Sequence, residues 1–321
     1  MKQIIFALWL FSAWLHAVVT LSPVNQIVVD GSAKDIALDG AWLYIGTDTG
    51  KMQSYNIQTK QFGPEVQFPD IKDFMGDTIH TRVSSLDTMD GRFVMLTDSG
   101  IGGYANIWMR ENNATVKLIS HEDKRTIVKI RFIDKEHILF GYLSNEASLF
   151  DIKNKKELYR VQLTESKFSD FALNNDRSMA AFGCESGEIT VIETQTGKTV
   201  KVLSGINKDN TYKVDFKSGM VSGAGQDRRG SLYHLDTGKG QFIEGSFLLY
   251  ATGLSPSAKR VAFAIDEENN IAVYKSSTLT KQYVLKGQKS TLNAIVFMDE
   301  DTVISASDDD TVMVWELRIR N

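Results

Sequence analysis

The feature that most constrains this chain is an internal repeat of about 41 residues. A bulky apolar residue recurs in seven similar segments, with successive spacings of 53, 42, 42, 41, 41 and 41 residues. The seven positions are Tyr55, Trp108, Phe150, Ile192, Tyr233, Tyr274 and Trp315. Each segment contains an apolar run, a small or polar turn and a second alternating run, which is typical of strands joined by tight turns. Seven such units predict an all-β, seven-bladed β-propeller with one four-stranded sheet per blade.

The two ends of the chain are expected to close the ring together. The last unit offers strands at 292–297, 302–306 and 311–317, but no convincing fourth strand follows. An unassigned strand-like run, Val24 to Val29, stands near the N-terminus. Because an unpaired sheet edge invites aggregation and propellers protect theirs, we predict that Gln26 to Val29 pairs beside the strand at 311–317.

The first nineteen residues differ from the rest of the chain. Lys2 provides a positive charge, Ile4 to Leu15 is almost unbroken apolar sequence, and Ala17 is a small residue at a suitable cleavage position. This order indicates a secretory signal peptide over residues 1–19 with cleavage near 17–21, followed by one propeller domain over 22–321. An uncleaved anchor is the alternative, although the apolar run is short for a spanning helix. We expect a periplasmic monomer without stable membrane insertion after cleavage.

Composition narrows the functional classes. The single cysteine, Cys184, is expected to be a buried filler, and it excludes an intramolecular disulfide and every site that needs paired cysteines. A net charge of -4 gives no basic surplus for binding nucleic acid. The histidines occupy unrelated positions in the repeat, and the loop at 100–103 stands between strands rather than before a phosphate-binding helix. We expect no catalytic residues, no cofactor, no cofactor-binding residues and no metal ligands, and hence a protein that is not an enzyme.

The long first spacing marks an insertion. Its extra residues fall in Gly63 to Thr81 and in an enlarged turn, Ser99 to Gly103. Loops on a rigid scaffold often carry binding residues, so the insertion is predicted to be a partner contact or a lid. A solvated insertion without a function is the alternative.

Several groups of polar residues resemble metal-binding or anion-binding sites, but we expect most of them to be turn residues. Asp70, Asp73, Asp77 and His80 do not have the spacing of a calcium loop. The run 308–310 is expected to be a hairpin turn, with Asp309 bonding backbone amides. The basic pairs at 124–125 and 228–229 are expected to be solvated turn residues. Asn113 begins an N-x-T sequence, which makes it a candidate glycosylation site in a turn.

The stretch 305–316 resembles the end of a WD40 repeat, with Trp315 at the tryptophan position and Glu316 where the family often has aspartate. The Gly-His pair of that family falls at Gly287 and Gln288, so the histidine of its usual His–Ser–Asp–Trp hydrogen-bond relay is replaced. The other six units resemble the repeat more weakly.

The signal-like segment, the seven degenerate units and the single cysteine together resemble the NapL family of propeller-type accessory proteins, which are encoded with periplasmic nitrate reductases. This resemblance implies a role in the assembly or electron supply of that reductase, with reductase components as protein partners. The chain is therefore predicted to be a non-catalytic, exported interaction platform. The alternatives are an envelope-assembly scaffold and a propeller enzyme of the quinoprotein or lactonase type.

Overall fold

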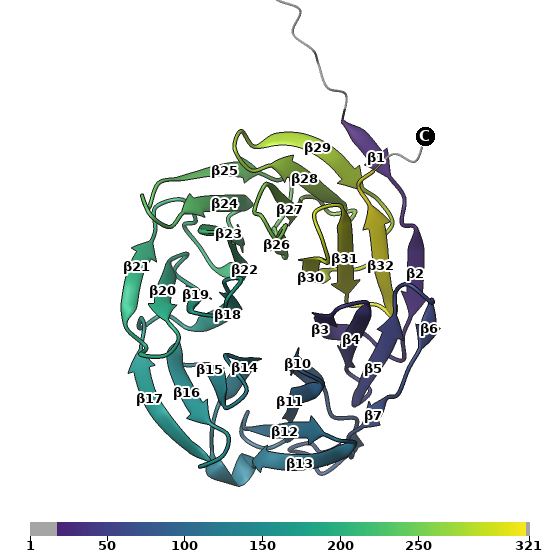
Figure 1. The fold of residues 1–321 in the computed structure, drawn as a ribbon, viewed down its shortest axis with the longest axis vertical. Coiled ribbons are helices and arrows are strands. Elements are labelled where there is room, and N and C mark those ends of the chain that lie inside the picture. Colours follow the sequence, from purple (N-terminus) through teal and green to yellow (C-terminus); the bar gives the residue numbers. More distant parts are fainter. Residues whose placement is uncertain (1–17, 319–321) are drawn as a thin grey trace, which may run out of the picture.

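The computed structural model describes residues 18–318 and arranges seven small β-sheets in a ring (Figure 1). Residues of the inner strands line a cavity at the centre of the ring, which we call the channel. The predicted seven-bladed β-propeller is confirmed. Within each blade the chain starts at the channel and moves outward through antiparallel strands. The inner strands are β3 (Ala33–Asp39), β10 (Val83–Met89), β14 (Ile127–Phe132), β18 (Phe168–Leu173), β22 (Thr211–Lys217), β26 (Thr252–Leu254) and β30 (Leu292–Phe297).

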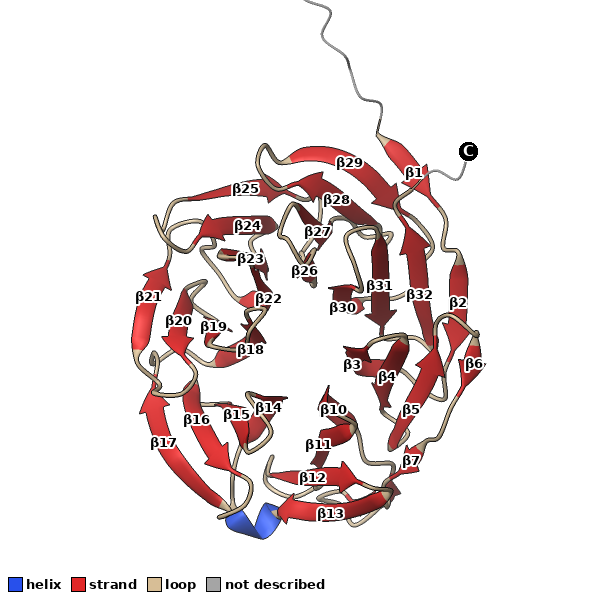
Figure 2. Ribbon diagram, in the orientation of Figure 1, coloured by secondary structure: helices blue, strands red, loops and turns tan. Residues whose placement is uncertain are grey.

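The remaining strands complete the blades in the same order. The second strands are β4 (Trp42–Thr47), β11 (Arg92–Asp98), β15 (His137–Tyr142), β19 (Met179–Cys184), β23 (Met220–Gly225), β27 (Arg260–Ala264) and β31 (Thr302–Ser307). The third strands are β5 (Lys51–Asn56), β12 (Ala105–Glu111), β16 (Glu146–Asp151), β20 (Ile189–Glu193), β24 (Arg229–His234), β28 (Ile271–Lys275) and β32 (Thr311–Glu316). The outer strands are β6 (Gln61–Phe62) with β7 (Val66–Gln67), β13 (Ala114–Ile119), β17 (Lys156–Gln162), β21 (Thr199–Leu203), β25 (Gly240–Glu244), β29 (Thr280–Leu285) and β2 (Asn25–Val28). A single turn of 3-10 helix, η1 (His121–Asp123), connects blades 2 and 3 (Figure 2).

The N-terminal strand closes the ring as predicted. Strand β2 pairs antiparallel with β32, and Ile27 lies opposite Val312. Two flanking backbone bonds, Val24 N to Val314 O and Val29 N to Asp310 O, are both 2.8 Å long. Ile27 and Val29 are buried in the apolar cluster that joins blade 7 to blade 1. The closing strand therefore contributes both hydrogen bonds and apolar burial.

Apolar packing between neighbouring blades forms the core of the molecule. Each main cluster draws its buried residues mostly from two adjacent blades, so the ring has a series of interfaces rather than one central core. In blades 1, 3 and 4 a glycine near the end of the second strand, namely Gly46, Gly141 or Gly183, permits this approach. A Cβ added to Gly46 would lie 2.7 Å from the carbonyl oxygen of Val83 in the next blade. A larger residue there would push the two blades apart.

The repeated bulky residues occupy one structural position in six of the seven blades. Tyr55 lies opposite Leu43, the second residue of its neighbouring strand, and the same pairing holds in blades 3 to 7. In blade 2 the equivalent residue is Arg110, opposite Phe93, whereas Trp108 lies two residues earlier, opposite Met95. The phase inferred from Trp108 was therefore wrong by two residues. The reason is that blade 2 has a charged residue, Arg110, at the repeated position, so a pattern of bulky apolar residues selects Trp108 two residues earlier.

A further strand precedes the closing strand. Strand β1 (Val19–Leu21) pairs in parallel with β29, so blade 6 has five strands. This strand lies before residue 22, where the sequence placed the start of the propeller. Residues 1–17, which hold most of the predicted signal peptide, lie outside the described residues. Within 18–318 no helix has the length and apolar character needed to cross a membrane.

Loss of apolar burial in the closing strand should destabilise the whole ring. We predict that Ile27→Ala lowers the free energy of unfolding by about 2–5 kcal/mol, the range for truncating a buried Ile side chain. Val28 belongs to the same strand but is 62% exposed, so Val28→Ala should change stability by less than about 0.5 kcal/mol. Urea unfolding of both variants measures the difference. Equal effects, or an unchanged melting curve after deletion of residues 24–29, would contradict the closure.

Candidate functional site

Alternate residues of the inner strands line the central channel, and many of them are charged. Asp35, Lys129, Asp170 and Lys213 each lie opposite the fifth residue of the second strand of their own blade. All four line the channel cavity. Because successive side chains of a strand point to opposite faces, a residue such as Ile130 is instead buried between blades. The repeat therefore brings four charged groups, far apart in sequence, to one level of the channel.

Carboxylates in the channel connect neighbouring blades. Four aspartates each accept a hydrogen bond from a backbone N–H of the inner strand of the next blade. These bonds join blade 1 to blade 2, blade 2 to blade 3, blade 4 to blade 5 and blade 5 to blade 6. The pairs are Asp35 with Leu86 at 2.9 Å, Asp87 with Phe132 at 2.8 Å, Asp170 with Val214 at 3.1 Å and Asp215 with Leu254 at 2.7 Å. A hydrogen bond to a charged acceptor is worth about 1.5–3 kcal/mol. These aspartates therefore have a structural role in holding the ring.

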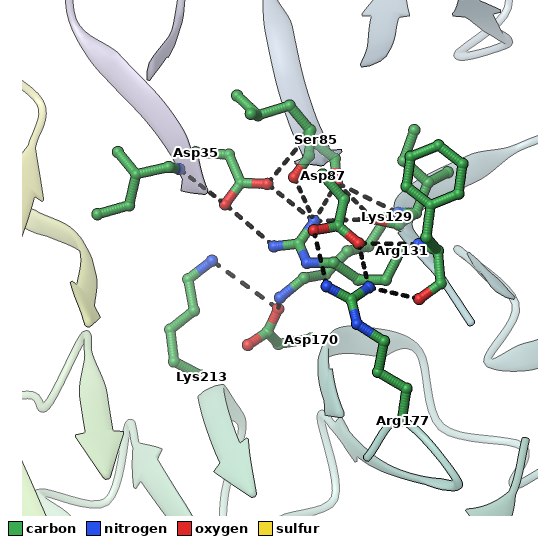
Figure 3. A network of polar contacts seen from close by, with 12 residues as sticks. Asp35, Ser85, Asp87, Lys129, Arg131, Asp170, Arg177 and Lys213 are labelled. Carbon is green, nitrogen blue, oxygen red and sulfur yellow. Dashed lines mark hydrogen bonds and ion pairs between the residues drawn. The ribbon is translucent and has the colours of Figure 1, made fainter. Parts of the chain in front are cut away.

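Basic side chains pair with the same carboxylates (Figure 3). Arg131 lies 3.0 Å from Asp35, and Arg177 lies 2.6 Å from Asp87. Arg131 also donates to the hydroxyl of Ser85 at 2.9 Å. These contacts cross between blades, so each arginine links its own blade to another.

Asp170 is shared by two lysines. Lys129 forms an ion pair with its Oδ1 atom, and Lys213 lies 4.0 Å from the same oxygen. Figure 3 shows both lysines directed toward this carboxylate from different blades.

Burial and charge act together on the titration of this network. Burial lowers the pKa of Lys129 to about 8, with Arg131 and Lys213 acting in the same direction and Asp170 opposing them. Burial tends to raise the pKa of Asp35, but Arg131, Lys129 and the N–H of Leu86 outweigh it and hold that pKa below its ordinary value. The channel is therefore a low-dielectric, charged environment.

The insertion between blades 1 and 2 is only partly a loop. Its first residues form β7, which pairs with β5 and extends the outer edge of blade 1. Its middle forms a short hairpin of β8 (Ile71–Lys72) and β9 (Thr78–Ile79). We call residues 70–80 the insertion hairpin.

The insertion hairpin presents apolar side chains to solvent. Phe74 and Met75 at its tip are 91% and 71% exposed. Asp73 orders the tip, since its Oδ1 atom accepts the N–H groups of Met75 and Asp77, both at 2.9 Å. Two large apolar side chains are thus exposed side by side on a hydrogen-bonded turn, and contiguous exposed apolar groups often mark an interaction site.

The second irregular segment supports the insertion hairpin. Gly100, in the enlarged turn between β11 and β12, packs so closely on β8 that an added Cβ would lie 2.0 Å from the carbonyl oxygen of Lys72. Ile101 beside it is 53% exposed. The structure thus brings together the two places where the sequence departs from the repeat, and the glycine loop joins two strands as predicted.

The acidic residues of the insertion do not converge on one point. His80 bonds Asp70 at 2.8 Å between Nδ1 and Oδ1, and Asp73 serves the turn. No group of three or more metal-ligating side chains was found among residues 18–318. The expected absence of a metal site remains a prediction.

The acidic turn in blade 7 has the predicted role. Asp309 accepts the backbone N–H of Thr311 at 2.8 Å and the hydroxyl of Ser307 at 2.9 Å. Asp308 pairs with Lys34 of blade 1 at 2.8 Å, a contact that the sequence did not suggest. The turn therefore stabilises a hairpin and the junction between the last and first blades.

Gln288 takes part in the polar chain where the WD40 resemblance places a relay. Its Nε2 atom donates to the hydroxyl of Ser305 at 2.7 Å. Trp315 is fully buried, but its Nε1 atom has no hydrogen-bond partner in the described part of the chain. The glutamine thus reaches the serine, while the tryptophan stands outside the chain of hydrogen bonds.

The other candidate residues occupy turns and interiors. Lys124 and Arg228 have left-handed backbone conformations, with φ of 52° and 63°. Their neighbours are not merely solvated, because Arg125 pairs with Glu157 at 3.1 Å and Arg229 donates to the carbonyl oxygen of Ile206 at 2.8 Å. That part of the turn prediction was wrong because both partners are distant in sequence and no local pattern indicates them.

Two remaining residues lie where the sequence placed them. Cys184 is buried, in agreement with its role as a filler. Asn113 is exposed in the turn between β12 and β13, and its glycosylation stays a prediction.

The channel network was missed by sequence reasoning. A signal was present, because Lys129, Asp170 and Lys213 recur at spacings of 41 and 43 residues inside otherwise apolar runs. A charge at a fixed position of an inner strand is unusual unless that position faces a channel.

Together, the fold and these two sites define the class of this protein as a seven-bladed β-propeller with a charged channel and a projecting hairpin. No protein-family model matches the chain, and a search of curated proteins found no match.

The depressed pKa of Lys129 predicts a specific pH dependence. Between about pH 8 and pH 10.5 the unfolded chain keeps the Lys129 proton while the folded chain has lost it. Stability therefore rises with pH in this window, by up to about 1.4 kcal/mol per pH unit. We predict that the free energy of unfolding of the native chain rises relative to that of Lys129→Met between pH 8 and pH 10. Urea unfolding at each pH measures this difference, and a flat or falling difference would contradict the assignment.

Proposed function

We propose that this chain is a non-catalytic protein-interaction platform that docks a protein partner through the insertion hairpin. The observation that carries the proposal is the exposure of Phe74 and Met75 on a tip whose backbone N–H groups are bound by Asp73. Aromatic and Met side chains are enriched in the buried core of protein–protein interfaces. An ordered tip also loses little conformational entropy on binding.

The charges beside the tip indicate the chemistry of the partner. Asp73 and Asp77 flank the two apolar side chains, and the nearby Asp70 is paired with His80. We infer a partner with an apolar pocket whose rim is basic, because opposite charges at a rim favour correct association.

The arrangement of the channel supports a non-catalytic role. Catalysis needs a nucleophile or base whose partners converge on space for a substrate. In the channel, Asp35, Asp87 and Asp170 instead direct an oxygen to a backbone N–H of the next blade. None of the four histidines in the described part of the chain lines the channel cavity. These groups have structural partners, which is why we favour a platform over an enzyme.

The particular role that we propose is that of an exported accessory factor for a periplasmic nitrate reductase, acting in its assembly or electron supply. This rests on the resemblance of the WD40-like units and the N-terminal segment to the NapL family. A reductase component would then be the partner of the insertion hairpin, and the chain itself would carry no electrons.

Partner capture with a hairpin variant tests the proposal. We predict that Phe74→Ser combined with Met75→Ser weakens partner capture from periplasm at least tenfold and leaves the melting temperature unchanged, since both side chains are solvent-exposed. A matched control is Val116→Ser combined with Leu158→Ser, which removes two exposed apolar side chains elsewhere. This control should capture the partner normally.

The identity of the captured proteins separates the particular roles. Nitrate reductase subunits that are recovered with the native chain and lost with the hairpin variant would support the accessory role. Recovery of outer-membrane assembly proteins alone would favour a scaffold instead. Equal capture by the native chain and the hairpin variant would contradict docking through the hairpin.

A further inference from the structure

The channel network contains more cations than carboxylates. Its labelled side chains include four cations and three carboxylates (Figure 3). The cations are Lys129, Arg131, Arg177 and Lys213, and the carboxylates are Asp35, Asp87 and Asp170. Lys217 and Asp215, the next charged pair along the channel, balance each other at 3.4 Å. One positive charge in the network therefore has no full partner.

Lys213 is the cation with the weakest pairing. Its nearest carboxylate oxygen, Oδ1 of Asp170, lies 4.0 Å away and is already bound by Lys129. The other oxygen of Asp170 accepts the N–H of Val214. The Lys213 side chain is 34% exposed, and this residue lines the channel cavity. A cation in such a partly desolvated place favours an anionic partner.

The channel cavity, which Lys213 lines, has room for a small molecule. Its volume is about 550 Å³, which lies within the range of small-molecule sites. Part of the cavity wall is apolar and comes from blades 1 and 7, through Ala37, Ala294 and Val296. A ligand that contacts both Lys213 and the apolar wall would have one negatively charged group and a compact apolar group.

We propose that the channel binds a small organic carboxylate, which pairs with Lys213 next to Asp170 and rests its apolar body on Ala37, Ala294 and Val296. This site goes beyond the platform function and does not depend on the insertion hairpin. A channel ligand would occupy the centre of the ring, whereas the protein partner would bind the hairpin.

Binding should be coupled to protonation of Lys129. The charged groups that act on Lys129 are Asp170, Arg131, Lys213 and Asp35, and burial together with the two cations keeps its pKa low. A bound carboxylate adds a negative charge near this group and raises its pKa. Complex formation near pH 8 should therefore take up protons.

Isobutyrate and isobutyramide provide a matched pair of probes, because they have nearly the same shape and differ in charge. We expect isobutyrate to raise the melting temperature of the full chain in a saturable manner, as a ligand of the folded state does. Neither isobutyramide nor chloride at the same ionic strength should give a saturable rise in the melting temperature. Equal shifts with isobutyrate and chloride would show a general salt effect and overturn the site.

Three variants test the residues. Lys213→Met should weaken isobutyrate binding at least tenfold in calorimetric titration, whereas Lys167→Met, which changes a surface lysine paired with Glu185, should bind normally. Ala294→Leu should weaken isobutyrate more than the smaller acetate, because it fills the place of the apolar body. Melting curves check that each variant is folded. Full binding by folded Lys213→Met would overturn the proposal.

Proton uptake on binding is a measurement that would not change if Lys213 had only a structural role. The titration with isobutyrate is repeated at pH 8 in two amine buffers of different ionisation enthalpy, so that neither buffer competes as an anion. Heats that differ between the buffers, with the sign of proton uptake, support binding beside Lys129. Equal heats would place the carboxylate elsewhere and overturn the site. Failure of partner capture by the insertion hairpin would leave these results unaffected.

Discussion

The structure depends on contact between neighbouring blades, because a propeller blade has two broad faces and neither is covered by its own strands. Apolar side chains fill each interface, and the glycine at the end of a second strand, such as Gly46, lets the next inner strand come within contact distance. The channel aspartates add a directed bond at several of the same interfaces. These contacts form a complete ring only if blade 7 is also joined to blade 1. Strand β2 makes that junction by pairing with β32 and burying Ile27.

This architecture separates two physical environments. The channel is enclosed by inner strands and holds charges that are mostly paired at short range, with Lys213 as the weakly paired cation, so its chemistry is that of a partly desolvated ionic network. The insertion hairpin projects from the junction of blades 1 and 2 and exposes apolar groups to water. A rigid ring can support both, since a hairpin that binds a partner need not disturb the inner strands. The proposed partner and the proposed carboxylate therefore use different parts of one scaffold.

Much of the fold could be predicted because a propeller is built from a local unit that repeats. Alternating residues and turns reveal each hairpin, and constant spacing reveals the number of blades. The role of Asp309 could also be predicted, because a turn aspartate bonds amides within two residues. Contacts across blades could not be predicted in this way. The pairing of Arg125 with Glu157 and the sharing of Asp170 by two lysines join residues from different strands or blades, and no local pattern encodes them.

The sequence by itself determined the seven-bladed ring, its closure by the N-terminal strand and the location of the one long insertion, since these follow from periodicity and from an unpaired strand at each end. The tertiary structure alone decided the register of blade 2, where Arg110 rather than Trp108 holds the repeated position. It also decided that the insertion folds as a hairpin against Gly100 and that charged residues meet in the channel. The physical reason is that spacing specifies pairing within a blade. The environment of a side chain depends on the neighbouring blade, which lies about 40 residues away in sequence.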